Sequence, residues 1–206
     1  MDPIRKTAGI LIAIGVIEAI PLGLTIAGSP PGVLQRLYGF DPHVWPAWLL
    51  AAAVTIGYIL YAVRRLPLIG ERMFDWHWLK LVAVLFAIVT GTFEELFFRK
   101  MLMEWAAGGG ASPLLQVFVS AIIFGVAHAV WGLFGRQWRV ALGAALSTTV
   151  LGGLLALVYL AAARQVAPCI WAHMLINLVL EPWLILAAVT AFAKRGAGVP
   201  ESAPAA

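Results

Sequence analysis

Residues 79–103 read LKLVAVLFAIVTGTFEELFFRKMLM, and this stretch decides what kind of fold the chain adopts. The run is long enough to cross the hydrocarbon core of a bilayer as a helix, which takes about 20 mostly apolar residues. It nevertheless contains two adjacent carboxylates, Glu94 and Glu95, and a guanidinium, Arg99. A charged side chain at the bilayer centre costs about 2.5–3.5 kcal/mol on insertion scales, so such groups are rarely kept without a use. The stretch therefore predicts a transmembrane helix that carries a functional site.

The composition of the whole chain is that of a membrane protein. Of its 206 residues, 62% are hydrophobic and 12% are charged, and the mean hydropathy is +0.93. Soluble domains have about 45–50% apolar and about 25% charged residues. The single cysteine, Cys169, excludes a disulfide framework, and the high apolar content excludes disorder. The net charge of +4 comes from basic pairs at the ends of apolar runs, a pattern that orients membrane proteins and does not indicate nucleic-acid binding.

Six apolar stretches are long enough to span the bilayer, and glycine or proline residues separate them. We predict an all-α fold, a polytopic transmembrane helical bundle of about six spans. A single transmembrane domain is expected over residues 1–195, with its motif core over 79–192, and a disordered tail over 196–206. The six predicted spans cover about residues 8–27, 45–63, 79–103, 113–134, 140–163 and 167–192.

The basic residues predict the orientation of the chain. Ten of the 14 Lys and Arg residues fall on the side that holds both termini when six spans are drawn. The positive-inside rule then predicts a multi-pass protein of a bacterial-type cytoplasmic membrane with both termini in the cytoplasm. In this orientation the third span runs outward and Glu94 lies in its outer half. A site that opens to the cytoplasm would then require a third helix that extends past the membrane, or a re-entrant run.

Helical spacing sorts the polar residues inside the spans. Glu95 and Arg99 are four residues apart, in the acid-first order that favours an ion pair on one helix face. Glu94 is rotated by about 100° from Glu95 and must face a different neighbour. His173 and Asn177, on the sixth span, are also four residues apart and point into one space. One such pair of polar residues is well explained by a cluster that only holds helices together. Several sets of polar residues on different spans instead favour a functional site.

Three short motifs follow one another on separate spans. They are EExxxR, FxxxH and HxxxN, and they comprise Glu94, Glu95 and Arg99, then Phe124 and His128, then His173 and Asn177. This series resembles the signature of the CAAX protease and bacteriocin-processing family. Its members are intramembrane endopeptidases and include the type II CAAX prenyl endopeptidases and the abortive-infection proteins. The motifs cover less than half of the chain.

The resemblance implies a site that hydrolyses a peptide bond without a cofactor. Glu94 would act as the general base on a water that His128 also binds, and His173 and Asn177 would donate hydrogen bonds to the tetrahedral oxyanion. The implied partners are the lipid bilayer and a peptide or protein presented at the membrane, and whether a lipid group on that substrate is read stays open. Supporting roles fall to Glu95, Arg99 and Phe124.

The residues leave several alternatives open. Two histidines and one glutamate are a known catalytic zinc set, so Glu94, His128 and His173 are alternative zinc ligands, although the chain has no HExxH motif. Cys169 precedes His173 by four residues, which makes a cysteine–histidine dyad a further alternative. A non-catalytic scaffold or immunity-type protein, or a small proton-coupled transporter, would use the same cluster without hydrolysis.

Two further carboxylates fall inside predicted spans. Glu18, beside Pro21 in the first span, is either a buried functional acid or an interfacial one. Glu181 directly precedes Pro182 and is expected to mark a kink or a break in the sixth span.

Overall fold

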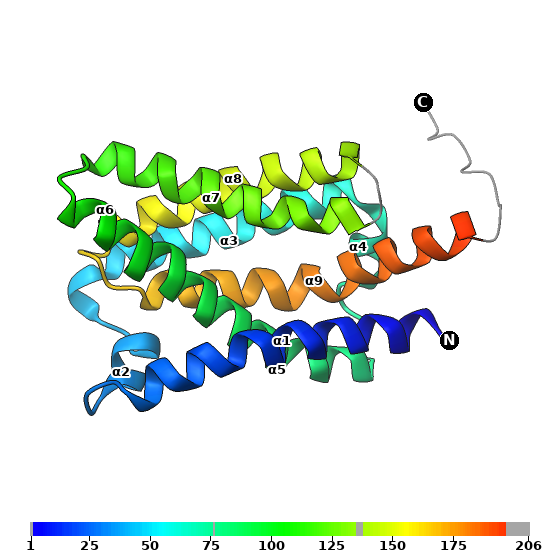
Figure 1. The fold of residues 1–206 in the computed structure, drawn as a ribbon, viewed down its shortest axis with the longest axis horizontal. Helices are drawn as coiled ribbons and strands as arrows, with labels where there is room; N and C mark the ends of the chain where they lie inside the picture. The colour runs from blue at the N-terminus through cyan, green and yellow to red at the C-terminus, as the bar shows by residue number, and fades with distance from the viewer. Residues whose placement is uncertain (1, 76, 135–137, 197–206) are drawn as a thin grey trace.

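The computed structural model describes residues 2–75, 77–134 and 138–196, and this part of the chain is an all-helical bundle without a strand (Figure 1). Each of the six predicted spans coincides with one long helix, so the predicted fold class is confirmed. The long helices are α1 (Pro3–Ala27), α3 (Trp45–Arg65), α5 (Trp78–Glu95), α7 (Pro113–Phe134), α8 (Trp138–Ala161) and α9 (Ala167–Gly196). The short segments are α2 (Val33–Tyr38), η1 (Pro42–Val44), α4 (Pro67–Arg72), η2 (Leu96–Met103) and α6 (Glu104–Gly108).

The helices have the length and the surface of membrane spans. Five are long and apolar enough to cross a bilayer, and the described part of α7 adds a shorter apolar helix, Pro113–Ala129. At 1.5 Å per residue the 21 residues of α3 extend about 32 Å, close to the thickness of a hydrocarbon core of about 30 Å. Large apolar side chains face outward; Ile17, Leu24 and Leu81 are 69%, 72% and 70% exposed. Such a surface suits lipid and not water, and the chain is a multi-pass membrane protein.

One continuous helix carries the charged motif. The segments α5, η2 and α6 join into 31 residues, Trp78–Gly108, which end five residues beyond the predicted Met103. Glu94 is the 17th of these residues and so lies near the middle of the helix, not toward its end. The segment η2 is π-helical and begins at Leu96, directly after the two glutamates. Short π-helical stretches inside α-helices often mark functional sites, and the helical spacing of the motif residues does not predict this one.

Close helix contacts hold the bundle around α9, which packs against α1, α3, α5 and α8. On one side of α9, α7 and α8 lie against each other, and on the other side α1 lies against α5 (Figure 1). Glycines permit the α7–α8 contact. A Cβ at Gly125 would lie 2.6 Å from the Ala145 carbonyl oxygen, and one at Gly152 would lie 3.0 Å from the Phe124 Cβ. Small residues at such contacts are typical of transmembrane helix pairs.

The first residues of α1 and the last residues of α9 lie at the same end of the bundle, together with α4 (Figure 1). Arg64 and Arg65 end α3 at this end, and Arg72 ends α4. Helix α9 continues through Pro182 to Gly196, so the sixth span is not broken at Glu181. The predicted tail after residue 196 lies outside the described residues.

Candidate active site

The motif residues come together from three helices in the middle of the bundle. Glu94 and Glu95 are the last two residues of α5, His128 belongs to α7, and His173 and Asn177 belong to α9. The chain separates the two histidines by 45 residues, yet both lie within 4 Å of the same glutamate oxygen. The convergence that the three motifs imply is therefore present in the fold.

Glu95 forms the centre of a fully buried charge network. Its Oε2 lies 3.0 Å from Arg99 Nε, as the spacing of four residues predicts, and its Oε1 lies 2.8 Å from His173 Nδ1. Arg99 also donates from Nη2 to the carbonyl oxygen of Gly152 at 3.2 Å. Glu95 and Arg99 are 0% exposed, so each charge depends on the other for compensation. The network holds the His173 ring in one orientation, a contact that the sequence reasoning missed.

Phe124 packs between the two histidines and the arginine. It is 0% exposed, its ring centroid lies 4.4 Å from that of His128 and 5.6 Å from that of His173, and the Arg99 guanidinium carbon lies 4.9 Å from it. A guanidinium over an aromatic ring is an attractive cation–π contact. Close contact of α8 through Gly152 leaves this ring little freedom. Phe124 thus contacts the rings of both histidines and the guanidinium of Arg99 at once.

The hydrogen bonds of the two histidines define which ring nitrogens face Glu94. His128 Nδ1 lies 2.9 Å from the Phe124 carbonyl oxygen, which can only accept, so Nδ1 carries the proton. His173 Nδ1 likewise donates to the Glu95 carboxylate. In each neutral imidazole the lone pair is then on Nε2, and these atoms lie 3.6 Å and 3.8 Å from Glu94 Oε2. Three acceptors facing one another favour a proton-bearing molecule between them, such as a water.

A cavity of about 400 Å³ adjoins these groups. Glu94, His128 and Asn177 line it, and the Glu94 side chain is 15% exposed. Asn177 is 7% exposed and donates from Nδ2 to Thr90 Oγ1 at 3.1 Å. Thr90 in turn donates to the carbonyl oxygen of Phe86 at 3.0 Å, which leaves its oxygen as the acceptor for Asn177. Thr90 therefore determines how the Asn177 amide is turned.

Two carboxylates that the motifs do not include, Glu18 of α1 and Glu181 of α9, also line this cavity. For Glu181 a signal existed in the sequence, because His173, Asn177 and Glu181 follow one another at intervals of four on one helix face. For Glu18 no sequence signal connects the first span to the motifs. Only the packing of α1 against α5 and α9 brings it there.

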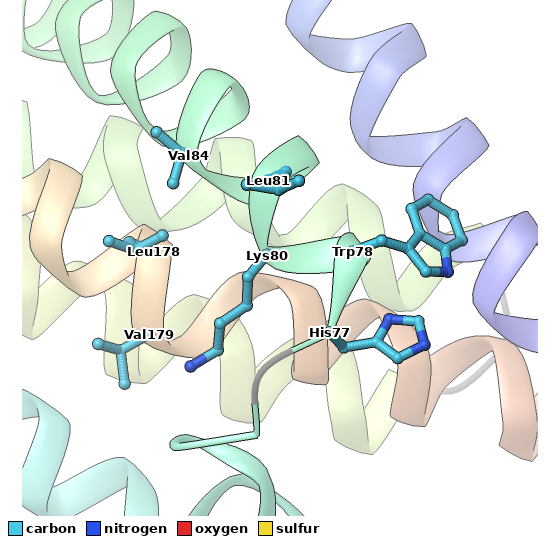
Figure 2. A pocket seen from close by; sticks show the side chains of 7 residues that line it. All are labelled: His77, Trp78, Lys80, Leu81, Val84, Leu178 and Val179. Carbon is cyan, nitrogen blue, oxygen red and sulfur yellow. The ribbon is translucent and has the colours of Figure 1, made fainter.

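A second cavity of about 400 Å³ lies at the start of α5 and is unrelated to this chemistry (Figure 2). Its walls are the His77 side chain and side chains of α5 and α9, mostly aliphatic, and no carboxylate of the described residues lines it. The Lys80 ammonium already donates to the carbonyl oxygen of Met73. The site of interest is therefore the cavity that holds Glu94.

The structure bears differently on the two alternatives, a cysteine–histidine dyad and a zinc site. Cys169 is buried, its thiol donates to the Leu155 carbonyl oxygen at 3.3 Å, and it does not line the cavity, so the fold gives no support to a dyad with His173. Within the described ranges no group of three or more His, Cys, Asp or Glu side chains is arranged to hold a metal ion. Glu94, His128 and His173 are still the residue types of a known catalytic zinc set. The Nε2 atoms of His128 and His173 lie 3.6 Å and 3.8 Å from Glu94 Oε2.

Comparison with known proteins identifies a family for this chain. The family model of the type II CAAX prenyl endopeptidase Rce1-like group matches residues 76–179, which are 104 of the 206 residues. No curated protein and no solved structure matches the chain. The matched region begins at the start of α5 and ends within α9, so it includes all seven motif residues. The resemblance seen in the motifs is thereby confirmed, and the chain belongs to the type II CAAX prenyl endopeptidase Rce1-like family of membrane proteases.

Proposed function

We propose that this protein is an intramembrane endopeptidase that cleaves a peptide or protein segment presented at the membrane, with Glu94 as the general base. One observation supports the assignment above the others. Glu94 Oε2 lies between Nε2 of His128 and Nε2 of His173, at 3.6 Å and 3.8 Å, on the wall of a cavity large enough for a peptide segment.

Hydrolysis would begin with a water held by Glu94 and His128. The Glu94 carboxylate takes one proton, and the hydroxide oxygen attacks the carbonyl carbon of the scissile bond. The tetrahedral intermediate then collapses, the C–N bond breaks, and Glu94 passes its proton to the leaving amine. Because Glu95 is already paired with Arg99, Glu94 is the carboxylate of the pair that is free to move a proton.

His173 and Asn177 would stabilise the oxyanion. The Asn177 amide has two N–H bonds, of which Thr90 accepts one, and the second is available to the intermediate. His173 donates from Nε2 when it carries a second proton, and the Glu95 carboxylate at Nδ1 balances the positive charge that results. Loss of one oxyanion donor typically lowers the rate by about 10²–10³.

This scheme needs no cofactor, and the zinc alternative is a testable variant of it. If a zinc ion were bound, Glu94, His128 and His173 would hold it, and it would supply Lewis-acid activation of the water. Peptide and lipid are the proposed partners, lipidation of the substrate is left open, and nucleic acid is not among them. We also propose a bacterial-type cytoplasmic membrane with both termini in the cytoplasm, because Arg64, Arg65 and Arg72 lie at the end of the bundle where α1 begins.

The decisive experiment compares membranes that contain wild-type protein with membranes that contain Glu94→Gln, by mass spectrometry of newly formed peptide termini. We expect cleavage products that depend on Glu94 and are equally lost in His128→Ala. Glu71→Gln is the matched control, because Glu71 is an exposed carboxylate of α4 outside the cavity. Products that persist in Glu94→Gln would reject the assigned base. A cellular phenotype kept by both site variants would indicate a scaffold, and proton-coupled uptake into proteoliposomes would indicate a transporter.

A further inference from the structure

The proposed hydrolysis assigns no role to Glu18 or Glu181, although both line the cavity where it would occur. Glu181 stands four residues after Asn177 on α9, which places it about 6 Å further along the same helix face. Glu18 faces it from α1, a helix that packs against both α5 and α9. One wall of the cavity therefore carries the proposed oxyanion donor, and the region beyond it carries two additional acids.

These acids are not directly paired with a cation in the described parts of the chain. Neither Glu18 nor Glu181 forms a hydrogen bond or an ion pair with a described residue, and the Glu18 Oε2 atom is buried without a hydrogen-bond partner. The nearby Asn177, 7% exposed, uses Nδ2 for Thr90, and its Oδ1 accepts no hydrogen bond from a described residue. Buried acceptors that lack donors are costly, the more so within a bilayer. The cavity is thus suited to a ligand that brings donors and positive charge.

The other side chains that line the cavity indicate which kind of cation it would bind. Within the ranges that the structure describes, no group of three acidic or histidine side chains is arranged to hold a metal ion, so a single small ion is not the occupant that this geometry fits. Four aromatic rings of the α5–η2 helix line the cavity: Phe86, Phe93, Phe97 and Phe98. Aromatic faces bind alkylammonium and guanidinium groups through cation–π attraction and also pack against an aliphatic stem.

We propose that Glu18 and Glu181 recognise a lysine or arginine side chain next to the scissile bond of the substrate. The aliphatic stem would pack on the phenylalanines, and the charged end would reach the two carboxylates. An extended peptide advances about 3.3–3.6 Å per residue, so a group about 6 Å from Asn177 corresponds to a residue one or two positions from the cleaved bond. The inference rests on the proposed function for its meaning, but it makes a binding prediction that requires no cleavage.

The test measures binding of two probes to the full-length protein in detergent micelles by NMR titration. The probes are Nα-acetyl-lysine N-methylamide and Nα-acetyl-norleucine N-methylamide, which share a four-carbon side-chain stem but of which only the lysine carries a terminal ammonium group. We expect the lysine probe to bind at least about tenfold more tightly, as a charge-assisted contact typically provides. In the variant with both Glu18→Gln and Glu181→Gln, the ratio of the two affinities should fall to about one. Thermal unfolding of that variant shows whether it is folded, and the wild-type comparison of the two probes stands without it.

Equal affinity of the two probes for the wild-type protein would overturn the inference. So would stoichiometric zinc that displaces the lysine probe from the wild-type protein but does not bind the variant with both Glu18→Gln and Glu181→Gln, since the two acids would then be metal ligands. Cleavage sites mapped in membranes give a second criterion, because products that depend on Glu94 should carry Lys or Arg within two residues of the cut. Sites without a basic residue contradict the subsite alone, whereas products that persist in Glu94→Gln contradict the catalytic assignment and leave the probe result as it is.

Discussion

Substitution by glutamine should destabilise the protein at Glu95 but should only remove activity at the adjacent Glu94. Glu95→Gln removes the charge that compensates Arg99, and both side chains are 0% exposed. Removing one partner of a buried pair costs about 3–5 kcal/mol of unfolding free energy, because the other charge stays buried. For a domain of this size about 1 kcal/mol lowers Tm by about 2–4 °C, so a decrease of roughly 6–20 °C is expected. Whatever folded protein remains should also lose the orientation of His173.

Glu94→Gln should instead leave the fold intact and remove activity. Glu94 is 15% exposed, and its Oε2 makes no hydrogen bond to a described residue. Replacing the carboxylate by an amide therefore breaks no hydrogen bond of that atom within the described residues. We expect Tm to change by less than about 2 °C, as for a substitution of about 0.5 kcal/mol. Loss of a general base lowers the rate by about 10²–10⁴.

The assay pairs thermal unfolding of purified protein in detergent with the yield of Glu94-dependent peptide termini in membranes, for wild type, both variants and Glu71→Gln. The reasoning would be refuted by a Glu95→Gln protein as stable as wild type, which would mean that Arg99 finds another partner. It would also be refuted by a Glu94→Gln protein that unfolds as easily as Glu95→Gln, since Glu94 would then be a structural residue.

Three further predictions concern the surroundings of the site. Thr90→Val removes the acceptor for Asn177 and should lower kcat about tenfold with little change of KM, while Thr90→Ser restores it; a loss seen only in KM would contradict a positioning role. Gly152→Ala adds a Cβ within 3.0–3.2 Å of three Phe124 atoms and should cost about 1–3 kcal/mol of stability and shift the site, whereas Gly153→Ala meets its nearest atom at an ordinary 3.6 Å and should be tolerated; equal effects would contradict the packing argument. Elemental analysis of purified protein should find no stoichiometric zinc, and a chelator should leave cleavage unchanged. If zinc were stoichiometric and its removal abolished activity, Glu94 would be a zinc ligand and not the general base.

The helices were predictable because their cause is local. A run of about 20 apolar residues can cross a bilayer only if its own backbone groups are satisfied, which a helix does within the segment. Residues 113–134 were predicted as one span, and α7 has those bounds. The π-helical stretch from Leu96 and the extension of the third helix to Gly108 were not predicted, since the segments share the same apolar composition and differ only in how neighbours pack on them.

The sequence by itself determined which residues carry charge in the membrane and which of them share a helix face, as with Glu95 and Arg99, because a spacing of four residues is a property of one helix. Tertiary structure alone decided that His173 holds Glu95 from another helix, that Phe124 contacts both histidines, and that Glu18 joins Glu181 beside the site. Contacts between helices depend on where a glycine lets two backbones approach and on how each helix is rotated. These choices minimise the energy of the whole bundle and leave no periodic pattern in the chain.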